Sequence, residues 1–132
     1  MKSIKWSDGQ HGAKDFIIEA DNLDRPVTGA IWLPSSTTKT PSFVLCGHGA
    51  SGDRYQEPIP YLAKQLGKLK DTAILSIDGP VHGLRIIAPG GREAFFREMQ
   101  SPDFIDHMVR DWNLSLIHIS EPTRLGMISY AV

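Results

Sequence analysis

The sequence has little cysteine, no excess of either charge and no long apolar run. Its single cysteine, Cys46, excludes a disulfide framework and a site built from several thiolates. The 14 basic and 15 acidic residues give a net charge of -1 and are scattered, which argues against nucleic acid or an anionic membrane as partners. No stretch approaches the roughly 18 apolar residues of a membrane-spanning helix, and the N-terminus lacks the apolar segment of a secretory signal. We therefore expect a cytoplasmic protein whose partner is a small molecule.

The apolar pattern predicts an α/β fold. The 132 residues, 41% of them apolar, suffice for one globular domain. Two strand-like segments at residues 15–20 and 27–34, joined by the turn-rich stretch 21–26, predict an antiparallel strand pair. The run at 43–46 is apolar without alternation, which predicts a strand covered on both faces. A helix at 59–69 and a strand at 72–78 follow, and this order is typical of a parallel strand-helix-strand unit.

Residues 104–112 have the spacing of an amphipathic helix. The apolar stripe, predicted to face the core, consists of Phe104, Ile105, Met108, Val109 and Trp112. The opposite side carries Asp103, Asp106, His107, Arg110 and Asp111. Although Asp and His are metal ligands, we interpret this second set as a solvated face, because that interpretation needs no further assumption.

The most informative segment is the stretch Gly-His-Gly-Ala-Ser-Gly at residues 47–52, which we call the glycine loop. Glycines between a strand and a helix let backbone N–H groups point at a phosphate or at an oxyanion. The loop satisfies G-x-G-x-x-G, so one alternative is a small α/β binding domain that uses it for a nucleotide or another anion. That fingerprint needs the helix to begin at the last glycine, whereas residues 53–60 contain Asp53 and two prolines, which delay the helix.

Two motifs resemble those of α/β-hydrolases. The HGxxG loop of that superfamily is similar to His48-Gly49-Ala50-Ser51-Gly52. The D-x-P-G-H-G turn that follows the next strand is similar to Asp78-x-Pro80-x-His82-Gly83, with Val81 where the family has glycine. The resemblance extends over residues 10–113 and is nearest to dienelactone-hydrolase-like and related esterase or peptidase branches.

The resemblance implies hydrolysis of an ester, thioester, lactone or amide by acyl transfer to serine, on the N-terminal portion of an α/β-hydrolase sheet. It implies that the backbone N–H of Ala50 donates to the oxyanion, that Gly49 belongs to the oxyanion loop, and that His48 shapes this loop. It implies no cofactor and no metal. The expected partner of the intact enzyme is a small ester- or amide-like molecule.

The nucleophile of this superfamily is missing from the sequence. No serine lies in G-x-S-x-G, and the closest match, residues 49–53, ends in Asp53. A triad of Ser51, His82 and Asp78 is not expected, because in this fold the serine precedes both acid and base on such an elbow. We expect an inactive N-terminal fragment that lacks nucleophile, acid and base.

The last residues differ in character from the rest. Residues 114–132 contain only two charged residues, and Pro122 ends any helix that reaches it. The string SLIHISEPTR resembles a tail found on many unrelated conceptual translations, which predicts an adapter-derived, non-native tail at 114–132 after a truncated domain at 1–113. The alternative is a buried strand at 115–119. In the family's strand order the next strand would lie beside 43–46, so we expect that edge to be open.

Overall fold

The structure is a computed structural model that describes residues 2–34, 41–68, 71–86 and 91–119. Its elements in chain order are β1 (Lys2–Asp8), β2 (Lys14–Ala20), β3 (Val27–Trp32), β4 (Ser42–Cys46), α1 (Ile59–Leu66), β5 (Thr72–Ile77), the 3-10 turn η1 (Gly83–Arg85), α2 (Gly91–Met99) and α3 (Phe104–Ile119). The strand β1 and the helix α2 were not predicted from the sequence. The helix α1 ends at Leu66 rather than at residue 69.

The strands form one mixed sheet in the order β1-β2-β3-β5-β4. The pairs β1/β2, β2/β3 and β3/β5 are antiparallel, and β4/β5 is parallel. The predicted antiparallel pair corresponds to β2 and β3, and the predicted parallel unit corresponds to β4, α1 and β5. The α/β fold class is confirmed.

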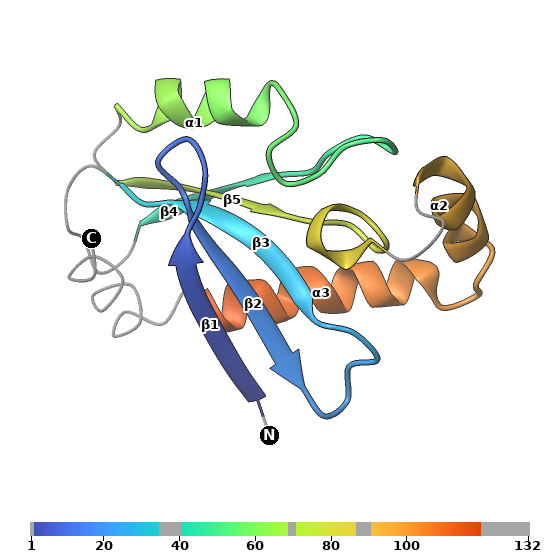
Figure 1. Cartoon of the computed structure of the whole chain (residues 1–132). Coiled ribbons are helices and arrows are strands. Elements are labelled where there is room, and N and C mark those ends of the chain that lie inside the picture. Colours follow the sequence, from blue (N-terminus) through green and yellow to red (C-terminus); the bar gives the residue numbers. More distant parts are fainter. Residues whose placement is uncertain (1, 35–40, 69–70, 87–90, 120–132) are drawn as a thin grey trace.

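Helices cover both faces of this sheet (Figure 1). On one face α1 packs over a small apolar cluster whose buried members are Ala13, Ala30, Trp32, Ile59, Ala63 and Ile74. On the other face α3 contributes to the larger cluster of Phe16, Ile18, Val27, Ile31, Ala73, Leu75, Ile77 and Ile119. The sheet is therefore the middle of three layers. The segments that follow β4 and β5 leave the sheet at its edge, between the two helical layers.

The prediction that the strand at 43–46 is covered on both faces holds in part. Phe43 packs against the larger cluster and Val44 and Cys46 pack against the smaller one, but no residue of β4 is fully buried. Among the described strands β4 pairs only with β5. The side chain of Leu45 is 45% exposed. A short apolar run does not distinguish a central strand from an edge strand, and the expected open edge beside this strand is present in the described part of the sheet.

The helix α3 departs from the sequence prediction in length and in orientation. It crosses residue 114 without a break, so residues 115–119 are helical and not a strand. Ile105 and Val109 are 65% and 53% exposed, and the buried positions are Asp111, Leu114, Ser115, His118 and Ile119. These positions follow the i, i+3, i+4, i+7, i+8 pattern of a core-facing helix. The buried face of α3 is therefore not the one predicted from residues 104–112. Residues 120–132 lie outside the described residues, and the origin of the segment from 114 onward stays a prediction.

None of the helices in the described ranges is both long enough and apolar enough to cross a membrane.

Candidate functional site

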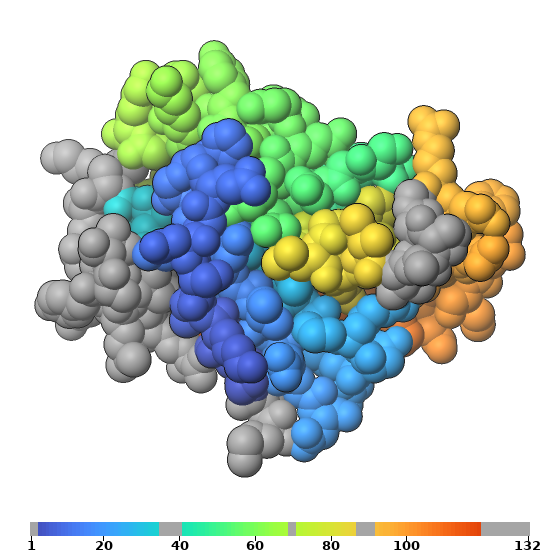
Figure 2. Space-filling view, viewed as in Figure 1, coloured from blue at the N-terminus to red at the C-terminus, as the bar shows by residue number. Residues whose placement is uncertain are grey.

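The glycine loop and the turn after β5 meet at one edge of the sheet. The loop follows β4, and residues 78–83, which we call the β5 turn, follow β5; the carboxyl ends of parallel strands lie at the same edge. The N–H of Gly79 donates to Nε2 of His48 at 2.8 Å. Figure 2 shows the loop after β4 (teal to green) lying against the segment after β5 (yellow). The two motifs singled out in the sequence are thus in direct contact.

His48 connects these two segments. Because its Nε2 accepts from Gly79, Nδ1 of the neutral ring carries the proton and donates to the carbonyl oxygen of Gly49 at 2.8 Å. The same carbonyl accepts from the N–H of Gly52 at 3.0 Å, which closes a β-turn over residues 49–52. A loop-shaping residue needs such contacts, and that role of His48 stays a prediction.

The N–H of Ala50 has no acceptor among the residues that the structure describes. The neighbouring N–H of Gly49, in contrast, donates to Oε1 of Gln56 at 2.7 Å. Ala50 is exposed and borders a cavity of about 90 Å³. The other lining residues are Gly47, His48, Gly49, Ile77, Gly79, Pro80, His82, Phe95, Met108, Asp111 and Trp112. A backbone donor is therefore available beside a small cavity with largely apolar walls.

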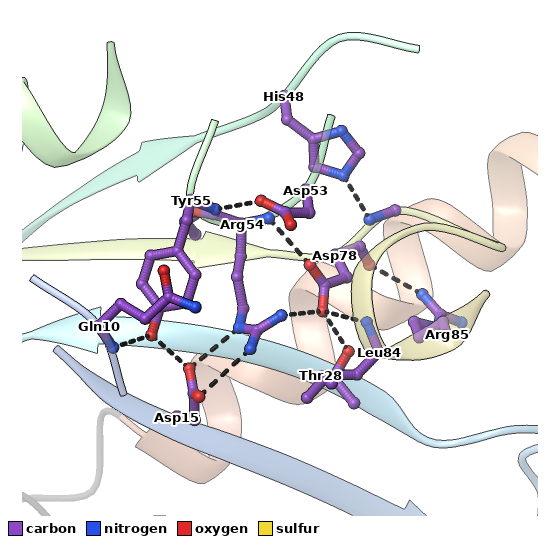
Figure 3. A network of polar contacts seen from close by, with 12 residues as sticks. Gln10, Asp15, Thr28, His48, Asp53, Arg54, Tyr55, Asp78, Leu84 and Arg85 are labelled. Atoms are coloured by element: carbon purple, nitrogen blue, oxygen red, sulfur yellow. Dashed lines mark hydrogen bonds and ion pairs between the residues drawn. The ribbon is translucent and has the colours of Figure 1, made fainter. Parts of the chain in front are cut away.

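Asp78, the first residue of the β5 turn, is a buried anchor. Its Oδ2 accepts from the hydroxyl of Thr28 at 2.6 Å and from Nη1 of Arg54 at 3.1 Å. Its Oδ1 accepts from the backbone N–H of Arg54 at 2.9 Å (Figure 3). A side chain at Gly83, where φ is +55°, would collide with this carboxylate. Asp78 thus joins the two motif segments to β3 and is fully engaged in doing so.

Arg54, which follows the glycine loop, lies at the centre of this network (Figure 3). It forms a bidentate ion pair with Asp15, at 2.9 and 3.2 Å, in addition to its bond to Asp78. Burial opposes the charged form of Arg54, but the hydrogen bond to Asp15 and the two carboxylate charges outweigh it and raise its pKa. Burial and a 2.5 Å hydrogen bond to Asp15 raise the pKa of Tyr55 to about 12. The segment that follows the glycine loop is therefore held to β2 and to the β5 turn by charge-assisted bonds.

Val81 occupies the position at which the D-x-P-G-H-G turn has glycine. Its φ is +60°, in the left-handed region where glycine is favoured, and its side chain is buried. The backbone at this position therefore has the conformation that a glycine adopts without strain.

Ser51, His82 and Asp78 do not form a triad. The ring of His82 bonds two carbonyl oxygens, those of Pro80 and Ala50. The hydroxyl of Ser51 accepts from Nε of Arg92 at 3.4 Å. With Asp78 engaged as described, each of the three side chains has a different partner.

The geometry of the described residues gives little support to nucleotide binding or to a metal site. The helix α1 begins at Ile59 rather than at Gly52, with Asp53 in the intervening stretch, so its N-terminus is not where a pyrophosphate would meet the loop. Within the described ranges, no three His, Cys, Asp or Glu side chains are grouped so that they could hold a metal ion.

Sequence reasoning missed the buried ion pairs formed by Arg54 and by Asp111. Arg54 was interpreted only as part of a stretch that delays α1, and Asp111 was placed on a solvated face. Asp111 instead bonds Arg85 at 2.9 Å, with both side chains almost completely buried. The continuation of the α3 pattern through Ile119 is the signal that places Asp111 on the buried face.

Comparison with known proteins gives a fold and no family. No protein-family model matches the chain, and no curated protein matches it. Among solved structures, a cold-adapted esterase from an Arctic intertidal metagenomic library, in complex with polyethylene glycol, is similar with a TM-score of 0.52 and 22% sequence identity. The match covers 87% of this chain and 47% of the esterase, so the chain spans about half of that protein's length. The described residues thus have an esterase-like α/β fold.

Proposed function

We propose that this chain carries the oxyanion-binding loop of a serine hydrolase that acts on an ester-, thioester-, lactone- or amide-like small molecule. The observation that carries the proposal is the N–H of Ala50, which borders the cavity and has no acceptor among the described residues, while the N–H of Gly49 is engaged. The esterase-like fold supports it. The dienelactone-hydrolase-like branch rests on the two sequence motifs alone.

The proposed chemistry is electrostatic. When a nucleophile attacks a carboxylic ester or amide, the carbonyl oxygen becomes negative, and a fixed N–H at that position lowers the barrier. Loss of one such donor typically costs about 3 kcal/mol, or 10²–10³-fold in kcat. Ala50 supplies one donor, and in this fold class the second follows the nucleophile.

We propose further that the nucleophile, acid and base belong to a longer, cytoplasmic enzyme and that the chain alone is inactive. Three facts support this. The 132 residues contain no G-x-S-x-G. The chain spans about half of the similar esterase. Among the described strands, β4 pairs on one side only, where a further strand can add.

An NMR titration with acetate, a carboxylate reaction product, tests the loop. The amide proton of Ala50 should move downfield and the indole of Trp112 should respond, because both groups border the cavity. One charge-assisted hydrogen bond contributes about 1.5–3 kcal/mol, which corresponds to half-saturation at about 10–100 mM.

The matched control is Ala50→Pro, which removes the N–H at the second position of the 49–52 turn, where proline is favoured. In this variant the response of Trp112 should disappear. An unresponsive Ala50 amide in the unmodified chain would contradict the proposal. A rise in melting temperature with a nucleotide would favour the alternative of an anion-binding domain.

A further inference from the structure

His82 is buried, and the proposed reaction leaves it without a role. It lies in the β5 turn, 5% exposed. Its Nδ1 is 2.8 Å from the carbonyl oxygen of Pro80, and its Nε2 is 2.5 Å from the carbonyl oxygen of Ala50. Carbonyl oxygens only accept hydrogen bonds and a neutral imidazole has one N–H, so a neutral His82 ring donates to one of these two carbonyl oxygens and a protonated ring donates to both. His82 therefore links the β5 turn to the residue whose N–H is the proposed oxyanion donor.

The two peptide groups that flank Ala50 are held by different histidines. The carbonyl of Gly49 belongs to the peptide before Ala50 and bonds His48 Nδ1. The carbonyl of Ala50 belongs to the peptide after it and bonds His82 Nε2. Peptide groups are planar, and φ and ψ are the only soft dihedrals of a residue. Holding both planes therefore fixes the direction in which the N–H of Ala50 points.

The ring of His82 is itself held in place. Phe95 of α2 meets it edge-on, with ring centroids 4.7 Å apart, and the ring of His48 lies 5.0 Å away. The turn that carries His82 is anchored through Asp78 to Arg54 and Thr28. A rigid ring on an anchored turn is a suitable support for a flexible glycine-rich loop.

We propose that His82 is a positioning residue for the glycine loop. Before substrate binds, it keeps the N–H of Ala50 directed at the position where the oxyanion will form. The proposal rests on the function proposed for this loop. A donor that is already oriented needs no reorganisation when negative charge develops, and this is the main source of oxyanion stabilisation. Since both ring nitrogens face carbonyls, His82 is not available to accept a proton as a general base.

Backbone ¹⁵N relaxation of the ligand-free chain tests this role. Order parameters of about 0.85 mark a rigid backbone and values below about 0.6 a flexible one. We expect Ala50 and Ser51 to be rigid in the unmodified chain and to fall below about 0.6 in His82→Ala, while Leu75 and Ile77 of β5 stay unchanged. Added imidazole should restore both order parameters in His82→Ala, because the vacated site borders the cavity.

Two further variants make the test decisive. His107→Ala, which removes a histidine from α3, should leave the loop rigid. His82→Gln retains an N–H donor and should give an intermediate order parameter, and it replaces His82→Ala if that variant does not fold. A loop that stays rigid in His82→Ala, or a loss of order that spreads equally through β5 in both His82 variants, would overturn the proposal.

The test needs no substrate, so it is separate from the proposed function. A loop that loosens while acetate fails to shift Ala50 would keep the positioning role and remove the oxyanion function. A loop that stays rigid while acetate binds would do the reverse.

Discussion

Val81 combines a β-branched, buried side chain with a φ of +60°. A residue with a Cβ pays about 1–2 kcal/mol for this left-handed conformation, whereas glycine adopts it freely. The variants Val81→Ala and Val81→Gly both lose the two buried Cγ methyl groups, and glycine also lacks the buried Cβ. Their difference therefore reports the strain at this position minus the burial of one carbon.

We expect Val81→Gly and Val81→Ala to differ by no more than about 0.5 kcal/mol in urea unfolding, because the relieved strain offsets the larger chain entropy of unfolded glycine and the loss of one buried carbon. The control is the buried Ala63 in α1, where no strain is relieved and Ala63→Gly should cost about 2 kcal/mol. If alanine is more stable than glycine by the same amount at both positions, the β5 turn is not strained at Val81.

Tyr55 makes stability depend on pH at the alkaline end. Burial and the hydrogen bond to Asp15 raise its pKa to about 12 from an ordinary value of 10.0. Below pH 10 the phenol is protonated in both states and its contribution is complete. Between pH 10 and 12 only the unfolded chain loses the proton, so the contribution declines as the pH rises.

Tyr55→Phe should therefore flatten the fall in the free energy of unfolding between pH 10 and 11.5, measured by urea titration at several pH values. In the same variant, the absorbance titration of the folded protein should lose a phenolate phase near pH 12. Equal slopes in the two proteins would show that Tyr55 titrates normally.

At the scale of elements, the segments from β4 to the β5 turn were predictable, because each carries a local signal. The run at 43–46, the helical spacing after residue 59 and the run at 72–78 all lie where the structure has β4, α1 and β5. The motif pair followed from their order, since parallel strands end at the same edge. The continued spacing of α3 indicates that Asp111 is buried, but the ion pairs of Arg54 with Asp15 and of Asp111 with Arg85 were not predictable, because the partners lie far apart in the sequence.

The second half of α3 covers residues that have two interpretations from the sequence, a non-native tail from residue 114 and a strand at 115–119, and its packing is easily tested. Ile119 is fully buried in the larger apolar cluster, whereas Ile117, two residues earlier, is 58% exposed. Ile119→Ala should lower the free energy of unfolding by about 2–5 kcal/mol, through lost burial and a cavity. Ile117→Ala should change it by no more than about 0.5 kcal/mol. Equal, small effects at both positions in urea unfolding would mean that residues from 114 onward do not pack on the sheet.

At the scale of the whole molecule, three observations bear on the proposed function. The described residues form an esterase-like sheet, the chain spans about half of that esterase, and β4 lies at the edge where a further strand can pair. Under the proposed function, the glycine loop, which contacts His48 and His82, would be one half of a site whose nucleophile lies on another segment.

The proposed function requires a gene that encodes a serine hydrolase and a nucleophile encoded after residue 113. The most direct measurement is to read the source DNA from the codon for Asn113 onward, in a preparation independent of the one that yielded this sequence. The account predicts that the frame continues through a strand into G-x-S-x-G, followed by an acid and a histidine. Confirmed codons for Leu114 to Val132 with a stop directly after them would contradict it, and a binding role for the glycine loop would then be the better explanation.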